Sequence, residues 1–350
     1  MTMNIFKKLL FLFKRPCIIL VAGKGRSCAK QAILQILKFY PEKKKVLIFE
    51  SALSDPKEVE KFKFLLRKSC LPILVVTHVG EIPPDKDFFA GDRSKALQIR
   101  KLAEVLPKQG FLILNFDDET VREMQDEIAA QSLTYGFQKR ADFQVSDVNV
   151  NLSGTNFKMD YQENIVPFWL KNLFGKEQIY SALTAICLGV VKNINLVEIS
   201  QALRTYQSLP GKMRLIKGIK NSSILDDSKG ASAFSMIEAL DILGKIETEG
   251  KKIVVLGDVL GIGKYTIEAH ETIGEKVARV SDLLFTVGSR AKFIAEGAKS
   301  KGMSEQNIFQ FNNVEEGKIR LQNEIKKGDL ILVDGSKEMK MGEIVQEIKE

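Results

Sequence analysis

Short apolar runs that alternate with helical patterns limit the possible folds of this chain more than any other feature. Strands are expected at 17–23, 44–50, 71–80, 110–118, 222–228, 251–258, 282–288 and 329–336. Helical patterns separate most of these runs. Regular alternation of this kind is typical of parallel strands joined by crossover helices. The sequence therefore predicts an α/β protein built from doubly wound sheets.

The length of the chain, 350 residues, indicates two domains. Residues 134–170 change in character, with polar turns between short strands that we expect to be antiparallel. After two further helical patterns, Pro210 and Gly211 interrupt the helical periodicity. We place an N-terminal basic amphipathic helix at 1–16, a first domain at 17–208 and a second domain at 209–350.

Composition narrows the functional classes only partly. Hydrophobic residues make up 45% and charged residues 27% of the chain, as in soluble globular proteins. The net charge of +8 suits phosphate ligands, nucleic acid or an anionic membrane surface. Because the basic runs carry no interleaved stacking aromatics, we expect no nucleic-acid partner. The four cysteines form no C-x-x-C pair, so we expect reduced thiols and a cytoplasmic protein.

The N-terminal segment 1–16 mixes Lys and Arg with Ile, Phe and Leu. It has neither the uninterrupted apolar run nor the cleavage site of a signal peptide, and it is too short to span a membrane. Two interpretations remain open. The favoured one is a helix packed on the domain that follows, and the other is a basic amphipathic segment in weak contact with the inner-membrane surface.

Five fragments, in order and at suitable spacing, resemble motifs of the Mur ligase family. They are VTHVG (76–80), LPKQGFLILNFDDETV (106–121), LPGKMRLIKG with SILDDSKGAS (209–232), VVLGDVLGIGKYTIEAH (254–270) and GDLILVDGSKEMKM (328–341). The fourth fragment, a glycine- and aspartate-containing motif followed by a histidine, resembles that of the subtype that adds a D-alanyl-D-alanine dipeptide. The resemblance implies a P-loop-type central domain that binds ATP and a Rossmann-like C-terminal domain that receives the amino substrate. Because about sixteen residues precede the first predicted strand, we expect no room for the family's UDP-sugar domain.

The resemblance also implies a reaction in peptidoglycan precursor synthesis. ATP activates a substrate carboxylate as an acyl phosphate, and an amine then displaces the phosphate. Such chemistry needs a phosphate cradle and Mg²⁺ held by oxygen ligands. The cradle is expected at Gly23-Lys24-Gly25-Arg26-Ser27, one residue shorter than the family loop and with Arg26 in place of its lysine. The alternative is a strand-to-helix turn kept only for folding.

Residue by residue, the resemblance implies a set of ligands. Nucleotide binding is assigned to Gly23, Gly25, Arg26, Ser27, Lys212 and Asp227, metal binding to Ser27 and Glu50, and the amino-substrate side to Asp258, His270 and Ser336. Other positions depart from the family. Ile99 stands at the carbamylated lysine, Glu177 at a histidine, Asp334 at a lysine and Lys337 at an arginine.

Two functional hypotheses follow. The first is an ATP- and Mg²⁺-dependent amide ligase of weakened or lost activity, whose ligand is a nucleotide or a UDP-muropeptide-like molecule. The second is a non-catalytic pseudo-ligase that binds a nucleotide, a muropeptide or a partner protein. Binding of Mg-ATP, and formation of ADP with candidate substrates, would distinguish them.

Overall fold

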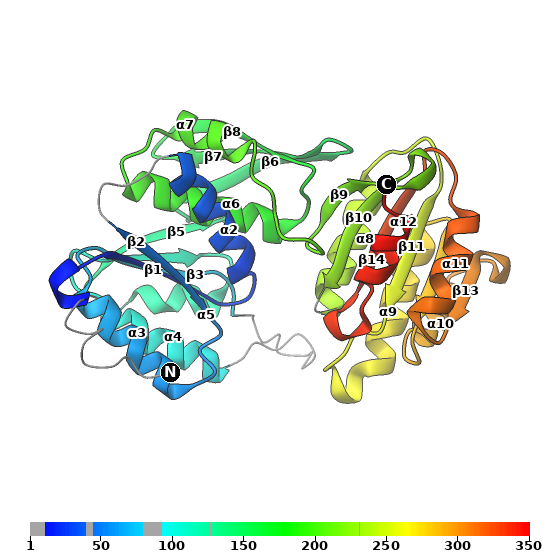
Figure 1. Cartoon of the computed structure of the whole chain (residues 1–350), viewed down its shortest axis with the longest axis horizontal. Coiled ribbons are helices and arrows are strands. Elements are labelled where there is room, and N and C mark those ends of the chain that lie inside the picture. Colours follow the sequence, from blue (N-terminus) through cyan, green and yellow to red (C-terminus); the bar gives the residue numbers. More distant parts are fainter. Residues whose placement is uncertain (1–10, 40–44, 80–92, 127, 231) are drawn as a thin grey trace. The chain divides into compact units, whose positions relative to one another are not determined.

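A computed structural model describes residues 11–39, 45–79, 93–126, 128–230 and 232–350. These residues form two compact units. The first comprises Met1–Val148, Asn156–Leu170 and Lys176–Gln207, and the second comprises Asn149–Thr155, Lys171–Gly175 and Ser208–Glu350. Each unit is built around its own part of the α/β pattern (Figure 1). The predicted α/β class with two sheets is confirmed.

The first sheet has the strand order β2-β1-β3-β4-β5-β6-β7-β8. Its strands are β1 (Cys17–Ala22), β2 (Val46–Ser51), β3 (Pro72–Val76), β4 (Phe111–Asn115), β5 (Gln131–Gly136), β6 (Phe143–Asn151), β7 (Gly154–Tyr161) and β8 (Asn164–Lys171). Strands β1 to β5 pair in parallel. The expectation of antiparallel strands from residue 134 is wrong for β5 and β6, which also pair in parallel. Two-residue links join β6 to β7 and β7 to β8, and neighbours joined so closely can only be antiparallel.

Helices cover both faces of the parallel part of this sheet. They are α2 (Arg26–Phe39), α3 (Pro56–Lys68), α4 (Arg93–Ala103), α5 (Glu119–Arg122), α6 (Lys176–Val191) and α7 (Leu196–Leu203). In Figure 1, α3 and α4 lie below the sheet, and α2 and α6 lie above it. Helix α3 begins where it does because Asp55 accepts a hydrogen bond from the Lys57 amide at 2.8 Å and Pro56 follows the cap. Its buried residues Val59, Phe62 and Leu65 join Leu20 of β1 in one apolar core.

The second sheet has the order β13-β12-β11-β14-β10-β9. Its strands are β9 (Arg214–Lys217), β10 (Ser223–Gly230), β11 (Lys252–Gly257), β12 (Leu283–Val287), β13 (Ile308–Phe311) and β14 (Leu330–Ser336). The pairs β10–β14, β14–β11, β11–β12 and β12–β13 are parallel, whereas β9 is antiparallel at one edge. The helices are α8 (Ala233–Lys245), α9 (Thr266–Val280), α10 (Lys292–Ser300), α11 (Val314–Glu324) and α12 (Gly342–Ile348). The carboxyl ends of β10, β11 and β14 therefore meet at one edge, where parallel sheets place their ligands.

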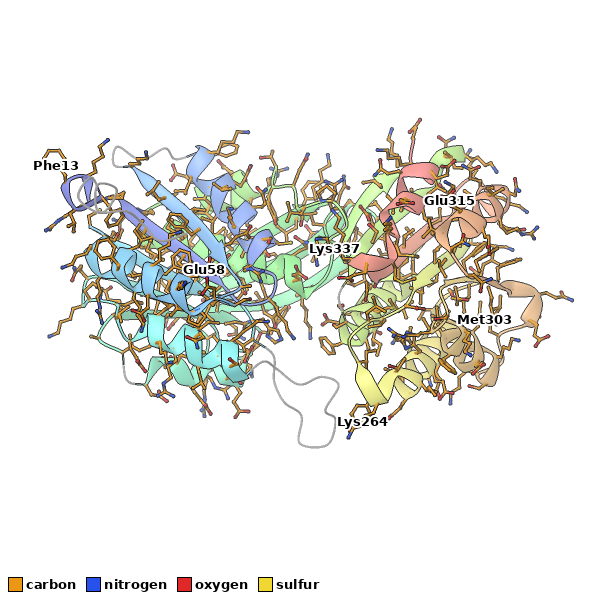
Figure 2. All side chains as sticks on the ribbon, turned by 60° about the horizontal axis from the view of Figure 1, so that its bottom comes forward. Phe13, Glu58, Lys264, Met303, Glu315 and Lys337 are labelled. Atoms are coloured by element: carbon orange, nitrogen blue, oxygen red, sulfur yellow. The ribbon has the colours of Figure 1, made fainter. Side chains whose placement is uncertain are left out.

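The described N-terminal residues begin with a helical turn at 11–14. Phe11 is buried in the first core, and its ring centroid lies 6.0 Å from that of Phe64. Phe13, by contrast, is 88% exposed and projects from the molecule in Figure 2. The rest of the predicted basic helix lies outside the described residues. Within the described part of the chain, no helix combines the length and apolarity needed to cross a membrane.

Candidate functional site

Loop 23–27 comprises the turn after β1 and the first two residues of α2, and it is held against the segment that follows β3. Gly23 has a φ of +106° and Gly25 a φ of +73°. A Cβ on Gly23 would lie 2.5 Å from the Thr77 hydroxyl oxygen and 2.8 Å from the His78 amide nitrogen. The Thr77 hydroxyl also bonds the Ala22 carbonyl at 3.0 Å. Only glycine fits this position, because both the backbone angle and the close approach exclude a side chain.

A buried carboxylate fixes the strand ends beside this loop. Asp118 is fully buried, and its Oδ2 lies 2.9 Å from Nδ1 of His78. The same oxygen accepts the Val79 amide at 2.7 Å, while Oδ1 accepts the Val121 amide at the start of α5. Asp118 and His78 therefore hold the loop's neighbours in place, and His78 is structural in this unit.

Arg26 and Ser27 open helix α2. The Arg26 guanidinium turns back and donates a hydrogen bond to the Gly23 carbonyl at 3.1 Å. The Arg26 side chain therefore stabilises the loop to which it belongs and does not project away from that loop. Ser27 is partly buried in the first helical turn. The first-turn amides of a helix point toward the preceding loop and attract anions, so loop 23–27 has the form of a phosphate cradle.

Two carboxylates near loop 23–27 have buried oxygen atoms without a hydrogen-bond partner among the described residues. Glu50 lies in β2, in register with Val21, and one of its oxygens is 3.6 Å from Nζ of Lys30. Its Oε2 is unpartnered. Glu177, near the start of α6, has an unpartnered Oε1. An unpaired buried acceptor is costly, and a bound cation or donor would remove that cost.

The carboxylates of Glu50 and Glu177 are suitable ligands for Mg²⁺ that is bound together with nucleotide phosphates. Mg²⁺ is usually held by one or two carboxylates together with substrate phosphates and water. Across the described ranges, no three histidine, cysteine, aspartate or glutamate side chains gather into a metal cage. The donor set therefore suits a magnesium–nucleotide complex, with Glu50 and Ser27 as candidate ligands.

In the second unit, the acids at the end of β10 bind the backbone around Lys212. Asp226 Oδ2 accepts the Gly211 amide at 2.8 Å, and Asp227 Oδ1 accepts the Met213 amide at 3.2 Å. Gly211 has a φ of +77°. The pair therefore sets the conformation of the segment that carries Lys212, the residue predicted to contact a nucleotide.

Asp334 is the most unusual acid of this unit. It is 1% exposed, and in the described part of the chain no hydrogen bond of normal length and angle reaches either carboxyl oxygen. Asp227 is its neighbour in the register of β10 and β14. Burial, and then the charge of Asp227, raise the pKa of Asp334 well above 3.8, against the opposing influences of the Gly335 backbone amide and of Lys212. Asp334 therefore favours the neutral acid. The interruption of the apolar run LILV by an aspartate was the sequence signal for it.

The predicted amino-substrate residues gather around the turn that follows β11. His270 is fully buried, and its Nε2 accepts the Val259 amide at 3.1 Å. Its Nδ1 therefore carries the hydrogen and donates to the Thr266 carbonyl at 2.6 Å. Both ring nitrogens are used within the unit, so His270 shapes the turn in this structure.

Asp258 and Ser336 hold the same turn from other sides. Asp258 Oδ1 accepts the amides of Arg290 and Ala291 at 3.0 and 2.7 Å. The Ser336 hydroxyl oxygen accepts the Leu260 amide at 2.9 Å. The structure thus brings Asp258, His270 and Ser336 together, with hydrogen bonds directed to the backbone.

Protonation of His270 is expected to destabilise this turn. Burial lowers the pKa of His270 below 6.5, so the unfolded chain takes up the proton first. Local stability should therefore fall as the pH drops below about 6.5, by at most about 1.4 kcal/mol per pH unit. Hydrogen exchange of the Val259 amide between pH 5 and 7, corrected for intrinsic rates, measures this. His270→Gln should flatten the dependence, and an equal slope in both proteins would refute the assignment.

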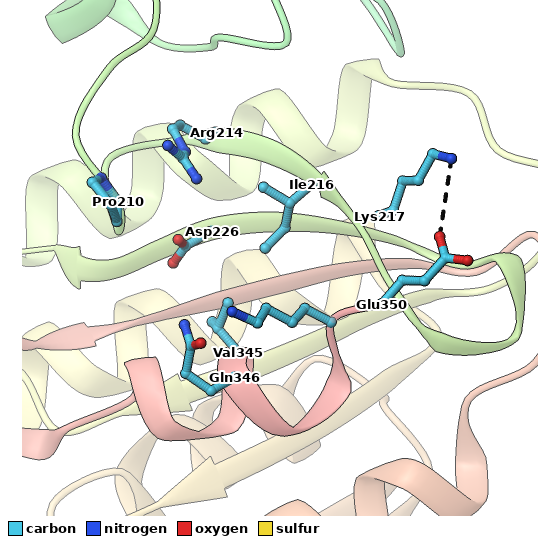
Figure 3. A pocket seen from close by; sticks show the side chains of 9 residues that line it. Pro210, Arg214, Ile216, Lys217, Asp226, Val345, Gln346 and Glu350 are labelled. Atoms are coloured by element: carbon cyan, nitrogen blue, oxygen red, sulfur yellow. Dashed lines mark ion pairs between the residues drawn. The ribbon is translucent and has the colours of Figure 1, made fainter.

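A cavity of about 330 Å³ lies elsewhere in the second unit (Figure 3). It is lined by Pro210, Arg214, Ile216, Lys217, Asp226, Val345, Gln346, Lys349 and Glu350. Lys217 and Glu350 form an exposed ion pair at 3.9 Å, and Asp226 is already bonded to the Gly211 amide. Since both acidic and basic side chains line it, this cavity has no strong preference for an anion.

Two family models match this chain. The Mur ligase middle domain matches residues 34–189, and the Mur ligase, glutamate ligase domain matches residues 211–337. Since the two models together match most of its length, the chain belongs to the Mur ligase family.

The chain is also similar to single curated ligases. The chain is 28% identical over 312 residues to the UDP-N-acetylmuramoyl-tripeptide--D-alanyl-D-alanine ligase of Bacillus subtilis (strain 168), covering 89% of this chain and 65% of that protein. It is also 28% identical to the enzyme of the same name from Escherichia coli (strain K12), over 70% of this chain and 53% of that protein. The chain thus spans somewhat over half to about two thirds of these relatives.

Solved structures share the fold. The crystal structure II of MurF from Acinetobacter baumannii has a TM-score of 0.78 at 16% identity, covering 97% of this chain and 78% of that one. MurF ligase from Thermotoga maritima, in complex with ADP, has a TM-score of 0.75 at 16% identity, covering 97% and 82%.

Proposed function

We propose that this chain acts in peptidoglycan precursor synthesis as a Mur-type ligase similar to the enzymes that add D-alanyl-D-alanine. In this reaction a carboxylate oxygen of the muramyl peptide attacks the γ-phosphorus of ATP, and ADP leaves. The amine of the dipeptide then attacks the acyl carbon, phosphate leaves, and the amine loses a proton. The family membership and the names of the relatives support this proposal.

The observation that carries the proposal is the conformation of loop 23–27. Gly23 and Gly25 take positive φ angles, and the loop opens into α2 at the carboxyl end of β1, which is flanked by the parallel strands β2 and β3. Phosphates fit against such a loop because amide groups face them without an intervening side chain. We assign magnesium to Ser27 and Glu50 there. Bound magnesium would neutralise phosphate charge during transfer. Lys212 and Asp227 stay predicted nucleotide ligands of the second unit.

Two further observations favour slow turnover. Arg26 is bonded to the Gly23 carbonyl, so its charge lies within the loop rather than over it. Ile99, at the family's carbamylated lysine, is 2% exposed and belongs to the apolar core, and its hydrocarbon side chain cannot bind metal. The same observations support the second candidate function, a pseudo-ligase that binds a nucleotide, a muropeptide or a partner protein without ligation.

The location of the protein belongs to the proposal as well. A ligase that consumes ATP and UDP-linked precursors would work in the cytoplasm. Contact of the N-terminal segment with the inner-membrane surface stays a prediction, since most of that segment lies outside the described residues.

Calorimetry with Mg-ATP tests the nucleotide site. We expect weak binding, with dissociation constants of roughly 10 µM to 1 mM. Ser27→Ala and Arg26→Ala should each lower the affinity for Mg-ATP further. Submicromolar binding that both substitutions leave unchanged would place the nucleotide elsewhere. With UDP-muramyl-tripeptide and D-Ala-D-Ala added, ADP formation that depends on both substrates supports the ligase. Binding without ADP formation supports the pseudo-ligase.

A further inference from the structure

Glu177 is a carboxylate placed against the phosphate loop. It is the second residue of α6, and the two helices α2 and α6 pack together. A Cβ built on Gly25 would lie 3.3 Å from Cγ and 3.5 Å from Oε1 of Glu177. The carboxyl group therefore lies within van der Waals distance of the loop glycine that precedes α2.

The free oxygen of Glu177 lacks a compensating donor. Oε1 is shielded from solvent and has no hydrogen-bond partner among the described residues. Three basic side chains of this region have other contacts. Arg26 bonds the Gly23 carbonyl, Lys30 lies 3.6 Å from Glu50, and Lys176 lies over the Phe137 ring. An anionic oxygen at this position repels phosphate, because like charges in a partly desolvated site interact strongly.

We infer that Glu177 makes nucleotide binding at loop 23–27 depend on a divalent cation. With a cation present, the free oxygen is a ligand for it, directly or through a bound water, and the cation links Glu177 to the nucleotide phosphates. Without a cation, the same carboxylate opposes the phosphates. Mg²⁺ prefers this combination of one or two carboxylates and phosphate oxygens. The inference rests on the proposed function, because it presupposes a nucleotide at this loop.

The experiment compares ATP binding by the full chain in magnesium and in EDTA. Wild-type protein should lose at least about tenfold in affinity when magnesium is removed. Glu177→Gln keeps the size of the side chain and removes its charge, so it should bind ATP more tightly than wild type in EDTA. The ratio of the affinities in magnesium and EDTA should fall to about threefold or less. Glu177→Ala should also lower this ratio of affinities. It replaces Glu177→Gln in the experiment if the glutamine variant does not fold.

Glu123→Gln is the matched control, since Glu123 is an exposed glutamate of the same unit. Its magnesium dependence should equal that of wild type. If both Glu177 variants bind ATP with the wild-type ratio, the inference is overturned and the proposed function stands. If none of the proteins binds ATP even in magnesium, the nucleotide site and the inference fail together.

Discussion

Replacement of Gly23 by alanine is expected to abolish nucleotide binding and to destabilise the first unit by about 2–4 kcal/mol. The φ of +106° is unfavourable for alanine. The new methyl group would also lie 2.8 and 2.9 Å from the backbone nitrogen and oxygen of His78. Backbone atoms cannot rotate away, so loop 23–27 would have to separate from the strand end that holds it.

Gly25→Ala is the matched control for this prediction. Its φ of +73° is also positive, but the nearest atoms belong to the flexible Glu177 side chain at 3.3 Å or more. We expect a smaller cost of about 1 kcal/mol. Trp169 is the only tryptophan and lies in the first unit, so its fluorescence during urea unfolding reports on this unit. A Gly23→Ala protein that unfolds like wild type and still binds Mg-ATP would refute the role of the loop.

Asp334→Asn is expected to stabilise the second unit near neutral pH, on the order of 1–3 kcal/mol. The pKa of Asp334 is raised from 3.8 by burial and by Asp227. Above pH 3.8 the unfolded carboxyl releases its proton while the folded one retains it. Wild-type stability therefore falls as the pH rises toward the folded pKa. Asparagine does not ionise, so its advantage should be small near pH 4 and larger near pH 7.

Hydrogen exchange of the β11 and β14 amides measures this effect within the second unit. Glu338→Gln provides a control, because Glu338 is exposed close to the end of β14. It should leave the pH dependence unchanged. An Asp334→Asn protein that is less stable than wild type at every pH would show that the buried carboxyl is stabilising.

The parallel strands of both sheets could be predicted because their apolar runs are local. The runs at 17–23 and 251–258 became β1 and β11 with small shifts at the ends. The short strands β9 and β13 and the helix α11 were missed. β9 and β13 have four residues each, too few for a periodic pattern. The predicted direction of β6 against β5 was wrong because a short connection usually joins antiparallel strands, whereas β5 and β6 pair in parallel through Tyr135 and Gly136 alone.

The site was predicted less completely than the fold. The glycines of loop 23–27 were found because the spacing of a phosphate loop is local. The contact of Asp334 with Asp227 was not, because it depends on the register between β10 and β14. Residue types at Asp258, His270 and Ser336 suggested ligands, but a sequence does not reveal which lone pairs the backbone already occupies.

The pairing of β9 limits how this protein can be divided into modules. On one side β9 pairs with β10. On its other side, the Leu215 amide bonds the Asn172 carbonyl at 2.9 Å, and the Phe174 amide bonds the Met213 carbonyl at 3.1 Å. Residues 171–175 thus complete the second unit although they precede α6 and α7 of the first. A fragment that starts at residue 208 would leave this strand edge bare and prone to aggregation, so exchange of either unit between related genes would require more than one crossover point.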